Sequence, residues 1–305
     1  MTDVAKISVV IPTYRRPDYL RRCLEGLETQ TRPADEIVVV RRSDDASTRR
    51  VVVEYPNRPL TEVLVSAAGV LAAMKAGMTK ARGRIVAFTD DDAVPRPDWL
   101  QRISHLLDDA SVGGVGGRDI QTPGDGSPPT HNVGRITAWG KVIGNHHAGI
   151  GPPREVMVLK AVNMAFRREA LRLPSGLRGQ GAQAHFEVAT CLWARRQGWR
   201  LLYDPQLIVD HYPAPRLDGD HRRTPGSSAV RDATYNLVWC LLAGNPGLYW
   251  RRAAYGLTIG DRAAPGIARA AMAALTGEWR IVRKLIPSLE GQVGALRDVR
   301  RGATA

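Results

Sequence analysis

The chain has 305 residues, a formal net charge of +13 and 44% apolar residues. This is the composition of an ordinary globular protein with a substantial core, which excludes wholesale disorder. Its 43 Lys and Arg against 30 Asp and Glu favour anionic partners, such as phosphate-bearing small molecules, anionic lipid or nucleic acid. The sequence has neither zinc-finger spacing nor an aromatic-rich basic stripe, so nucleic acid is not an expected partner and a basic nucleic-acid binder is only a minor alternative.

The cysteines and the apolar stretches indicate the compartment. Cys23, Cys191 and Cys240 are odd in number and far apart, which fits neither a disulfide framework nor a cysteine zinc site. The first residues lack the pattern of a signal peptide, and no stretch has the roughly 18 uninterrupted apolar residues of a spanning helix. We expect a cytoplasmic protein, and attachment to the inner face of the cell membrane stays open.

Strands and helices alternate in the first part of the chain. Near-continuous apolar runs predict buried strands at 7–11, 36–40, 61–65 and 84–89, and a glycine-rich strand at 112–117. Apolar residues three and four positions apart predict a helix that begins at Pro17 and buries Leu20, Cys23, Leu24 and Leu27. Small residues predict a second helix within 66–82, ended by Gly83. A third helix should have Asp98 as its N-cap and an inner face of Trp99, Ile103, Leu106 and Leu107.

This alternation predicts an α/β fold with a mostly parallel central sheet and right-handed crossovers. Ligands of such sheets bind beyond the carboxyl ends of the strands. Three loops should therefore meet at one edge, namely PTYRR (12–16), RRSDDAST (41–48) and TDDD (89–92).

The middle of the chain is less regular. Residues 121–155 are rich in Gly, Pro, His and Asn, which predicts long loops that line a substrate site. A strand leading into a helix is expected at 161–171. A further helix at 186–199 should be closed by Gly198 and should bury Val188, Cys191, Leu192 and Ala194.

The last third predicts two strands and a basic helical region. Residues 200–212 indicate a short strand, a turn at Asp204–Pro205 and a second strand entering His211, followed by a loop and by helices from about residue 229. Residues 231–305 hold 11 Lys and Arg against 5 Asp and Glu. Aromatic and apolar residues interleaved with arginine favour peripheral membrane contact, and they are Trp250, Tyr255, Trp279 and Ile281.

Four blocks in order carry a resemblance to a known family: SVVIPTYRRPDYLRRCLEGLETQTRPADEIVVV, AGMTKARGRIVAFTDDDAVPRPDWL, AVNMAFRREAL and FEVATCLWARRQGWRLLYDP. Over about residues 5–215 the chain resembles the family 2 glycosyltransferases, the inverting nucleotide-sugar enzymes of the Rossmann-like GT-A fold. The resemblance implies a GT-A domain at 1–228, with a nucleotide-sugar half at about 5–120 and an acceptor half at about 121–228. Residues 229–305 would form a basic helical C-terminal region.

The resemblance gives the acids of the TDDD loop a role. Carboxylates two positions apart on an extended segment point the same way, so Asp90 and Asp92 would face a divalent cation, Mg²⁺ or Mn²⁺, and the donor. Asp91 would point away, to cap or to pair with a basic neighbour at the edge of the nucleotide-sugar site. His211 falls where the family often supplies an imidazole to the cation. The alternatives are an acidic helix cap and a structural histidine.

The late helix departs from the family pattern at the catalytic base. The family usually has Glu-Asp there, and its Asp takes the acceptor proton. In this chain Phe186 and Glu187 occupy these positions. Glu187 is the expected base, because a base needs only an ionised carboxylate within reach of the acceptor. His185 is its competitor, and a structural acid at the helix start is the third alternative.

The nucleotide site departs from the pattern as well. Where family members often have an Asp after the second strand, Arg41 and Arg42 stand here. Arg41 would contact phosphate, or these arginines would pair with Asp44 and Asp45. The expected nucleotide-sugar contacts are Pro12, Thr13, Tyr14, Arg15, Arg41, Asp44, Asp90 and Asp91.

The resemblance implies metal-dependent inverting transfer of a sugar from a nucleoside-diphosphate sugar to an acceptor hydroxyl. The acceptor would be a glycan, a polysaccharide or a lipid-linked molecule of cell-envelope glycan biosynthesis. Two alternatives stay open. Phe186 and Arg41, at positions where acids are expected, fit a non-catalytic nucleotide-sugar-binding module. The segment IVAFTDDDAV also fits a haloacid-dehalogenase-type phosphatase with Asp90 as its nucleophile.

Overall fold

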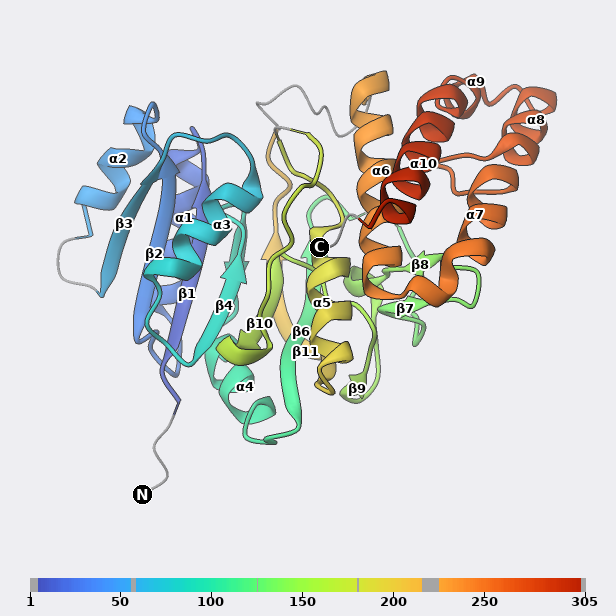
Figure 1. The fold of residues 1–305 in the computed structure, drawn as a ribbon. Helices are drawn as coiled ribbons and strands as arrows, with labels where there is room; N and C mark the ends of the chain where they lie inside the picture. Colours follow the sequence, from blue (N-terminus) through green and yellow to red (C-terminus); the bar gives the residue numbers. More distant parts are fainter. Residues whose placement is uncertain (1–4, 56–58, 125, 180, 216–224, 303–305) are drawn as a thin grey trace. The chain divides into compact units, whose positions relative to one another are not determined.

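The computed structural model describes residues 5–55, 59–124, 126–179, 181–215 and 225–302. The chain forms two compact units (Figure 1). Unit 1 comprises Met1–Arg135, Ile143–Arg172 and Trp193–Ala214, and unit 2 comprises Ile136–Val142, Leu173–Leu192 and Pro215–Ala305. The division at 228 and 229 expected from the sequence stays a prediction.

Unit 1 is built on a nine-stranded sheet in the order β3-β2-β1-β4-β10-β6-β11-β5, with β9 paired to β11. Its first four strands are parallel, and they are β1 (Ile7–Thr13), β2 (Glu36–Arg42), β3 (Leu60–Val65) and β4 (Ile85–Thr89). The prediction of four buried apolar strands in this part of the chain is confirmed in position, although side chains of β3 are partly exposed.

The other strands make the sheet mixed. β10 (Asn163–Arg167) runs antiparallel between β4 and β6 (Val112–Gln121), and β11 (Arg200–His211) runs parallel to β6. β5 (Ala93–Pro95) and β9 (Arg154–Glu155) pair antiparallel with β11. The expected α/β fold, a mostly parallel sheet flanked by helices, is thus confirmed.

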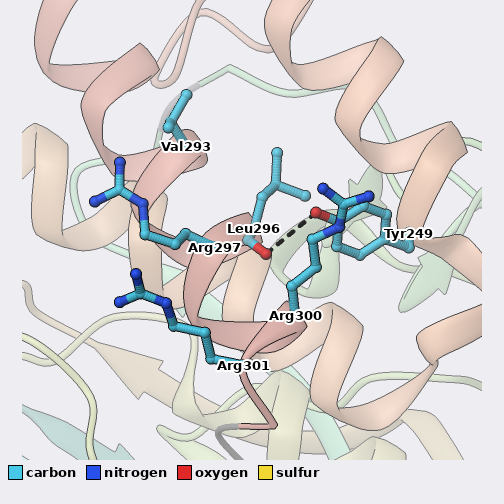
Figure 2. Close-up of a pocket in the computed structure, with 6 residues that line it drawn as sticks. All are labelled: Tyr249, Val293, Leu296, Arg297, Arg300 and Arg301. Atoms are coloured by element: carbon cyan, nitrogen blue, oxygen red, sulfur yellow. Dashed lines mark hydrogen bonds between the residues drawn. The ribbon is translucent and has the colours of Figure 1, made fainter.

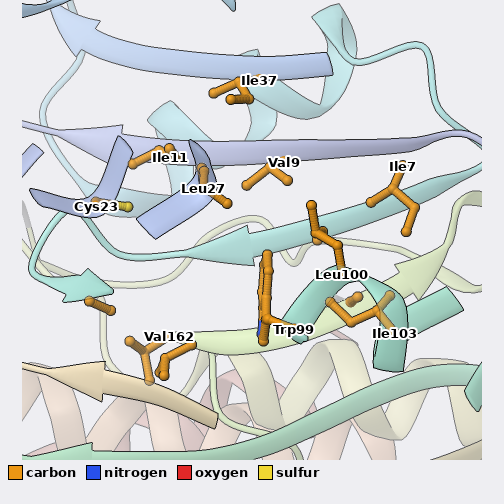
Figure 3. Packing of buried hydrophobic residues seen from close by; sticks show 14 of the residues in the cluster. Ile7, Val9, Ile11, Cys23, Leu27, Ile37, Trp99, Leu100, Ile103 and Val162 are labelled. Carbon is orange, nitrogen blue, oxygen red and sulfur yellow. The ribbon is translucent and has the colours of Figure 1, made fainter. Parts of the chain in front are cut away.

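Helices cover the two faces of the sheet because strand side chains alternate in direction. Ile7, Val9 and Ile11 of β1 share one apolar core with α1 (Pro17–Glu28) and α4 (Trp99–Leu106), as Figure 3 shows. Val10 points the opposite way, toward α3 (Val70–Lys80). Gly77 lets α3 approach closely, because a Cβ there would lie 2.4 Å from Cγ1 of Val10.

Three local predictions about helix ends are corrected. The second helix ends at Lys80 with Ala81 as its C-cap, rather than at Gly83, whose N–H donates to Oγ of Ser8. Asp98 occupies the N-cap position of α4 but makes no capping hydrogen bond, because its carboxylate pairs with Arg102 one turn on. The stretch after β10 holds a single 3-10 turn, Arg168–Ala170, in place of a helix.

Two further differences bear on the carboxyl edge of the sheet. The expected turn at Asp204–Pro205 is absent, and β11 continues through a register shift between Asp204 and Ile208. Asp204 Oδ1 accepts the N–H of Gln206 there, so the chain bulges instead of reversing. The helix α2 (Ala46–Val53) was not expected; it begins at Asp45, which accepts the N–H of Thr48.

The expected long loops of residues 121–155 are largely confirmed. After the end of β6 at Gln121, the described residues of this stretch, 122–124 and 126–155, form β7 (Arg135–Ile136), β8 (Val142–Ile143), β9 and the 3-10 turn His146–Ala148, and are otherwise irregular. The expected loop after Tyr212 includes residues 216–224, which lie outside the described part of the chain.

The C-terminal part of unit 2 is mainly helical, as the sequence predicts for the residues after about 229. Unit 2 also contains the first part of α5 (Phe186–Arg196), up to Leu192. The helices that follow in this unit are α6 (Ser227–Gly244), α7 (Tyr249–Thr258), α8 (Ile267–Leu275), α9 (Trp279–Val282) and α10 (Leu285–Arg300). α10 packs tightly on α6 at Gly291, where a Cβ would lie 2.3 Å from the carbonyl oxygen of Arg231. Among the helices that the structure describes, none combines the length and the apolar character that crossing a membrane requires.

Candidate active site

The acidic loop lies where β4 ends. The chain turns there into β5, and the N–H of Ala93 donates to the carbonyl of Asp90 at 3.2 Å. The register of β5 on β11 sets Ala93 opposite His211. Because of this pairing, the ring of His211 lies beside the acidic loop, with Nε2 3.3 Å from Oδ1 of Asp92. A further bond fixes the carboxylate, since Oδ2 of Asp92 accepts the N–H of Ala214 at 2.8 Å.

Asp90, Asp92 and His211 form a cluster suited to a metal ion. One ligand atom from each lies within 4.8 Å of the other two. Asp92 and His211 are buried and Asp90 is partly exposed. Two carboxylates are the hard oxygen ligands that Mg²⁺ and Mn²⁺ prefer, and an imidazole is compatible with Mn²⁺. The donor set therefore fits the cation that the sequence leads us to expect.

Asp91 faces away from this cluster, toward the loop after β1. It is buried, accepts a hydrogen bond from Oγ1 of Thr13 at 2.9 Å and pairs with Arg16 at 3.0 Å. Burial raises the pKa of Asp91 to about 7, although Arg16 and Thr13 act in the opposite direction. The expected pairing of the middle acid with a basic neighbour is confirmed, and its contact with a nucleotide sugar stays a prediction.

Asp119 is part of the site, although no sequence argument indicated it. It is fully buried on β6, with Oδ2 3.4 Å from Nδ1 of His211, and it forms an ion pair with Lys160. Burial acts to raise the pKa of Asp119, but His211 and Lys160 hold it at about 2. Burial likewise acts to lower the pKa of His211, but Asp119 and Asp92 raise it to about 9. The strand expected at 112–117 ends before Asp119, whereas β6 continues to Gln121 and carries Asp119 as its one acidic residue.

The loops after β1 and β2 meet at the same edge, as predicted. The N–H of Arg15 donates to Oδ2 of Asp45 at 2.5 Å, and the hydroxyl of Tyr14 donates to Oδ2 of Asp44 at 3.3 Å. The guanidinium of Arg42 lies over the ring of Tyr14, 4.3 Å from its centroid. These contacts join the two loops into one polar surface at the carboxyl ends of β1 and β2.

Arg41 has structural partners. Its side chain is buried, and its Nε donates to Oε1 of Glu62 at 2.5 Å. Nη1 donates to the carbonyls of Arg42 and Asp45. The expected ion pair with Asp44 is confirmed for Arg42, at 3.2 Å. For Arg41 the expected partner was wrong, because its ion pair is with Glu62. A phosphate contact by Arg41 stays a prediction.

The two candidates for the catalytic base belong to unit 2. Glu187 lies in the first turn of α5. It lies close enough to Cys240 of α6 to raise the pKa of that thiol, which burial raises more strongly. Burial and the positive charge of Arg252 lower the pKa of His185 to about 4, so its ring is neutral at neutral pH. The choice between the two stays a prediction.

A pocket of about 400 Å³ lies in unit 2 along α10 (Figure 2). The hydroxyl of Tyr249 donates to the carbonyl of Leu296 at 3.2 Å. The pocket is lined by Tyr249, Val293, Leu296, Arg297, Arg300 and Arg301. This lining offers no carboxylate, histidine or cysteine for proton transfer or metal binding, so the cluster around Asp90, Asp92 and His211 is the better candidate.

Comparison with known proteins points in the same direction. The model of a family described as "Glycosyltransferase like family 2" matches residues 5–224. Glycosyltransferase AglE of Haloferax volcanii is 29% identical over 116 residues, which are 36% of this chain and 38% of AglE. The uncharacterized glycosyltransferase YibD of Escherichia coli is 36% identical over 116 residues, 37% of this chain and 34% of YibD. The chain thus matches less than two-fifths of the length of either relative.

Solved structures share the fold. The mannosyltransferase PcManGT from Pyrobaculum calidifontis, in complex with GDP-Man and Mn²⁺, gives a TM-score of 0.60 at 20% identity, covering 97% of this chain and 88% of PcManGT. Residues 1–349 of TarS from S. aureus, in complex with UDP-GlcNAc, give a TM-score of 0.55 at 16% identity, covering 97% and 92%. These likenesses confirm the GT-A fold expected from the sequence.

Proposed function

The chain belongs to the glycosyltransferase-like family 2, and on that premise we propose that it transfers a sugar from a nucleoside-diphosphate sugar to an acceptor hydroxyl, with inversion and in a divalent-cation-dependent step. One observation carries the proposal. Asp90, Asp92 and His211 bring three ligand atoms within 4.8 Å of one another at the carboxyl edge of the sheet. This is the edge at which open α/β sheets bind their ligands.

Each residue of the edge has a part in the proposal. Asp90, Asp92 and His211 hold Mg²⁺ or Mn²⁺. When bound, the cation supplies positive charge that stabilises the departing diphosphate. Asp119 holds Nδ1 of His211, so that Nε2 stays directed at Asp92. Asp91 is buried against Arg16 and fixes the turn that carries its two neighbours.

The donor contacts come from the joined loops after β1 and β2. The side chains of Tyr14, Arg15 and Asp44 are at least partly exposed there, as is Pro12. Arg15 carries a positive charge suited to phosphate. Thr13 is buried, and its hydroxyl donates to Asp91.

Glu187 is the proposed base. A carboxylate that takes the proton of the acceptor hydroxyl lets that oxygen attack the anomeric carbon in one displacement, which inverts the configuration there. Glu187 lies in the first turn of α5. His185 is the competing candidate.

The substrate class and location follow the family. The complexes of PcManGT with GDP-Man and of TarS with UDP-GlcNAc support a nucleoside-diphosphate sugar as the donor class. The proposed acceptor is a glycan, a polysaccharide or a lipid-linked molecule of cell-envelope glycan biosynthesis. The proposed location is the cytoplasm, at the inner face of the cell membrane.

Thermal-shift titration tests the binding of donor and cation together, because ligands of the native state raise the melting temperature. The full chain is titrated with UDP-, GDP- and dTDP-sugars, each with Mn²⁺, Mg²⁺ or a chelator. NMR of the product's anomeric proton tests inversion. Asp92→Asn should lose the cation-dependent shift and roughly a hundredfold or more of the transfer rate. The exposed Asp108→Asn should keep both. Unchanged transfer by Asp92→Asn in chelator would overturn the cation's role.

Phe186 favours a second candidate function, a non-catalytic binding module, because it stands where the family usually has a Glu. A non-catalytic module would bind nucleotide sugar and cation without turnover. The same titrations decide between the two, provided free nucleoside diphosphate is measured beside them. Binding without release of the diphosphate, in the presence of a panel of acceptors, supports the module.

A further inference from the structure

α8 has an apolar face turned to solvent. Its residues are IARAAMAAL, and the side chains of Ile267, Met272 and Leu275 are 60%, 63% and 84% exposed. Ala268 and Ala271 are exposed as well. The five residues repeat at three- and four-residue spacing, so they form one stripe along the helix. The opposite side is occupied by the buried Ala270 and Ala273.

A helix on the surface of a soluble protein normally has the reverse pattern. α1 is an example within this chain, since its apolar Leu20, Cys23, Leu24 and Leu27 are buried while its exposed residues include Asp18, Arg22 and Glu25. On α8 only small alanines are buried, and the large apolar side chains are left in water. Apolar area exposed in this way favours a second surface that covers it.

Large exposed apolar side chains also follow α8 along the chain. α9 packs against α8, and Trp279 at its start is 59% exposed. Ile286, in the first turn of α10, is 69% exposed. We define the α8–α10 surface as Ile267, Met272, Leu275, Trp279 and Ile286. Tryptophan is enriched where apolar lipid meets the headgroups.

Basic residues accompany this surface. Residues 267–286 contain four Lys or Arg and one acid, Glu278. That acid is neutralised locally, because it forms an ion pair with Arg262. Arg280 and Arg283 are exposed and follow Trp279 along the chain. The combination of exposed apolar side chains with unneutralised cations is that of a segment lying in a membrane interface.

We propose that the α8–α10 surface docks the protein on anionic lipid headgroups, with its apolar side chains inserted among the acyl chains. A second copy of the chain is a poorer occupant, because two such surfaces would bring their arginines together in a protein of charge +13. The inference goes beyond the proposed transfer and needs neither donor nor cation. Failure of one is therefore distinguishable from failure of the other.

Vesicle flotation of the full chain tests the docking. The protein is mixed with phosphatidylcholine vesicles, or with vesicles that also contain phosphatidylglycerol, and bound protein is measured against lipid concentration. We expect binding to the anionic vesicles that weakens as salt is raised. Met272→Gln with Leu275→Gln should weaken it on the order of tenfold per side chain. Arg280→Gln with Arg283→Gln should weaken it roughly fivefold per cation.

Val53→Gln is the matched control, because Val53 is 65% exposed on α2 of unit 1. It should bind vesicles like the unsubstituted protein, and circular dichroism should show that all variants are folded. Fluorescence quenching is a second measurement, and it can be made on the unsubstituted protein. Brominated lipid should quench the tryptophan fluorescence of the protein, and Trp279→Phe should remove most of that quenching.

Three results would overturn the proposal. One is the absence of binding to anionic vesicles at low salt. Another is unchanged binding by the Met272→Gln, Leu275→Gln variant. The third is a dimer in sedimentation equilibrium that the same variant converts to a monomer while vesicle binding is absent, which would assign the surface to a second copy of the chain.

Discussion

Asp119 lies behind His211, with its Oδ2 3.4 Å from Nδ1 of the ring, and the other ring nitrogen of His211 lies 3.3 Å from Asp92. The ion pair with Lys160 holds the Asp119 carboxylate in place. Metal-binding histidines usually donate their second N–H to such a carboxylate, which fixes the orientation of the ring. This arrangement is built from β6 and β11, neighbours in the sheet.

Asp119→Asn should weaken Mn²⁺ binding about 10- to 100-fold, because the ring of His211 loses the charge that orients it. Isothermal titration of Mn²⁺ into the purified protein measures this without any transfer reaction. Asp210→Asn is the matched control, since Asp210 is the neighbour of His211 on β11 but pairs with the exposed Arg96. Equal Mn²⁺ affinities of the Asp119→Asn variant and the control would contradict the role of Asp119.

Glu187→Gln should leave donor binding intact and lower the transfer rate roughly a hundredfold to ten-thousandfold, the range of general base catalysis. The dissociation constant of the donor and the rate of diphosphate release in the presence of acceptor are measured side by side. Glu25→Gln, at an exposed position of α1, is the control. Retained transfer by Glu187→Gln together with its loss in His185→Gln would make His185 the base.

Arg41→Met separates the two roles considered for this residue. Loss of the guanidinium leaves Glu62 without this donor and removes one donor each from the carbonyls of Asp45 and Arg42, of which the latter still accepts the N–H of Asp45. We therefore expect a loss of about 1–3 kcal/mol in the free energy of unfolding. Donor affinity should not change under conditions where the variant is folded. Urea denaturation and donor titration provide the two measurements. A large loss of donor affinity with unchanged stability would restore the phosphate contact.

His146 should make stability depend on pH. Its Nε2 donates to the carbonyl of Val158 at 2.9 Å, and burial lowers its pKa from 6.5 to about 4. Between these values the unfolded chain binds a proton that the folded chain does not. The neutral form is therefore fully favourable above pH 6.5, and stability falls as the pH drops toward 4, by about 3 kcal/mol at most.

Urea denaturation at pH 7 and pH 4.5 checks this effect. His146→Gln keeps a donor for Val158 but does not titrate, so it should lose less stability between the two pH values than the unsubstituted protein. His105→Gln, at an exposed position on α4, should behave like the unsubstituted protein. Parallel losses in all three proteins would exclude His146 as a source of acid sensitivity.

Much of the fold was predictable because its signals are local. Continuous apolar runs marked β1, β2 and β4, and the strand–helix alternation placed their loops at one edge. The Asp90–Asp92 spacing and the family motif pointed to the cluster of Asp90, Asp92 and His211. The sequence did not predict Asp119 as a site residue, because its partner His211 is 92 residues away and only strand pairing brings the two together. The predicted partner of Arg41 was wrong for a similar reason, because Glu62 lies on the neighbouring strand β3.

Local turn and cap signals also failed to predict the structure at two places. Asp204–Pro205 has the composition of a turn, but pairing with β6 on both sides of it keeps β11 in the sheet. Asp98 stands where a cap is expected, and Arg102 competes for its carboxylate. In both places a contact made by the folded chain outweighs the local preference.

The burial of Asp91 also concerns how fast a cation binds. Its bonds to Thr13 and Arg16 tie the acidic loop to the loop after β1, and Ala214 fixes the carboxylate of Asp92. The conformational entropy of placing these ligands is therefore lost during folding and not during binding. Association with Mg²⁺ or Mn²⁺ would then need no slow step of loop ordering.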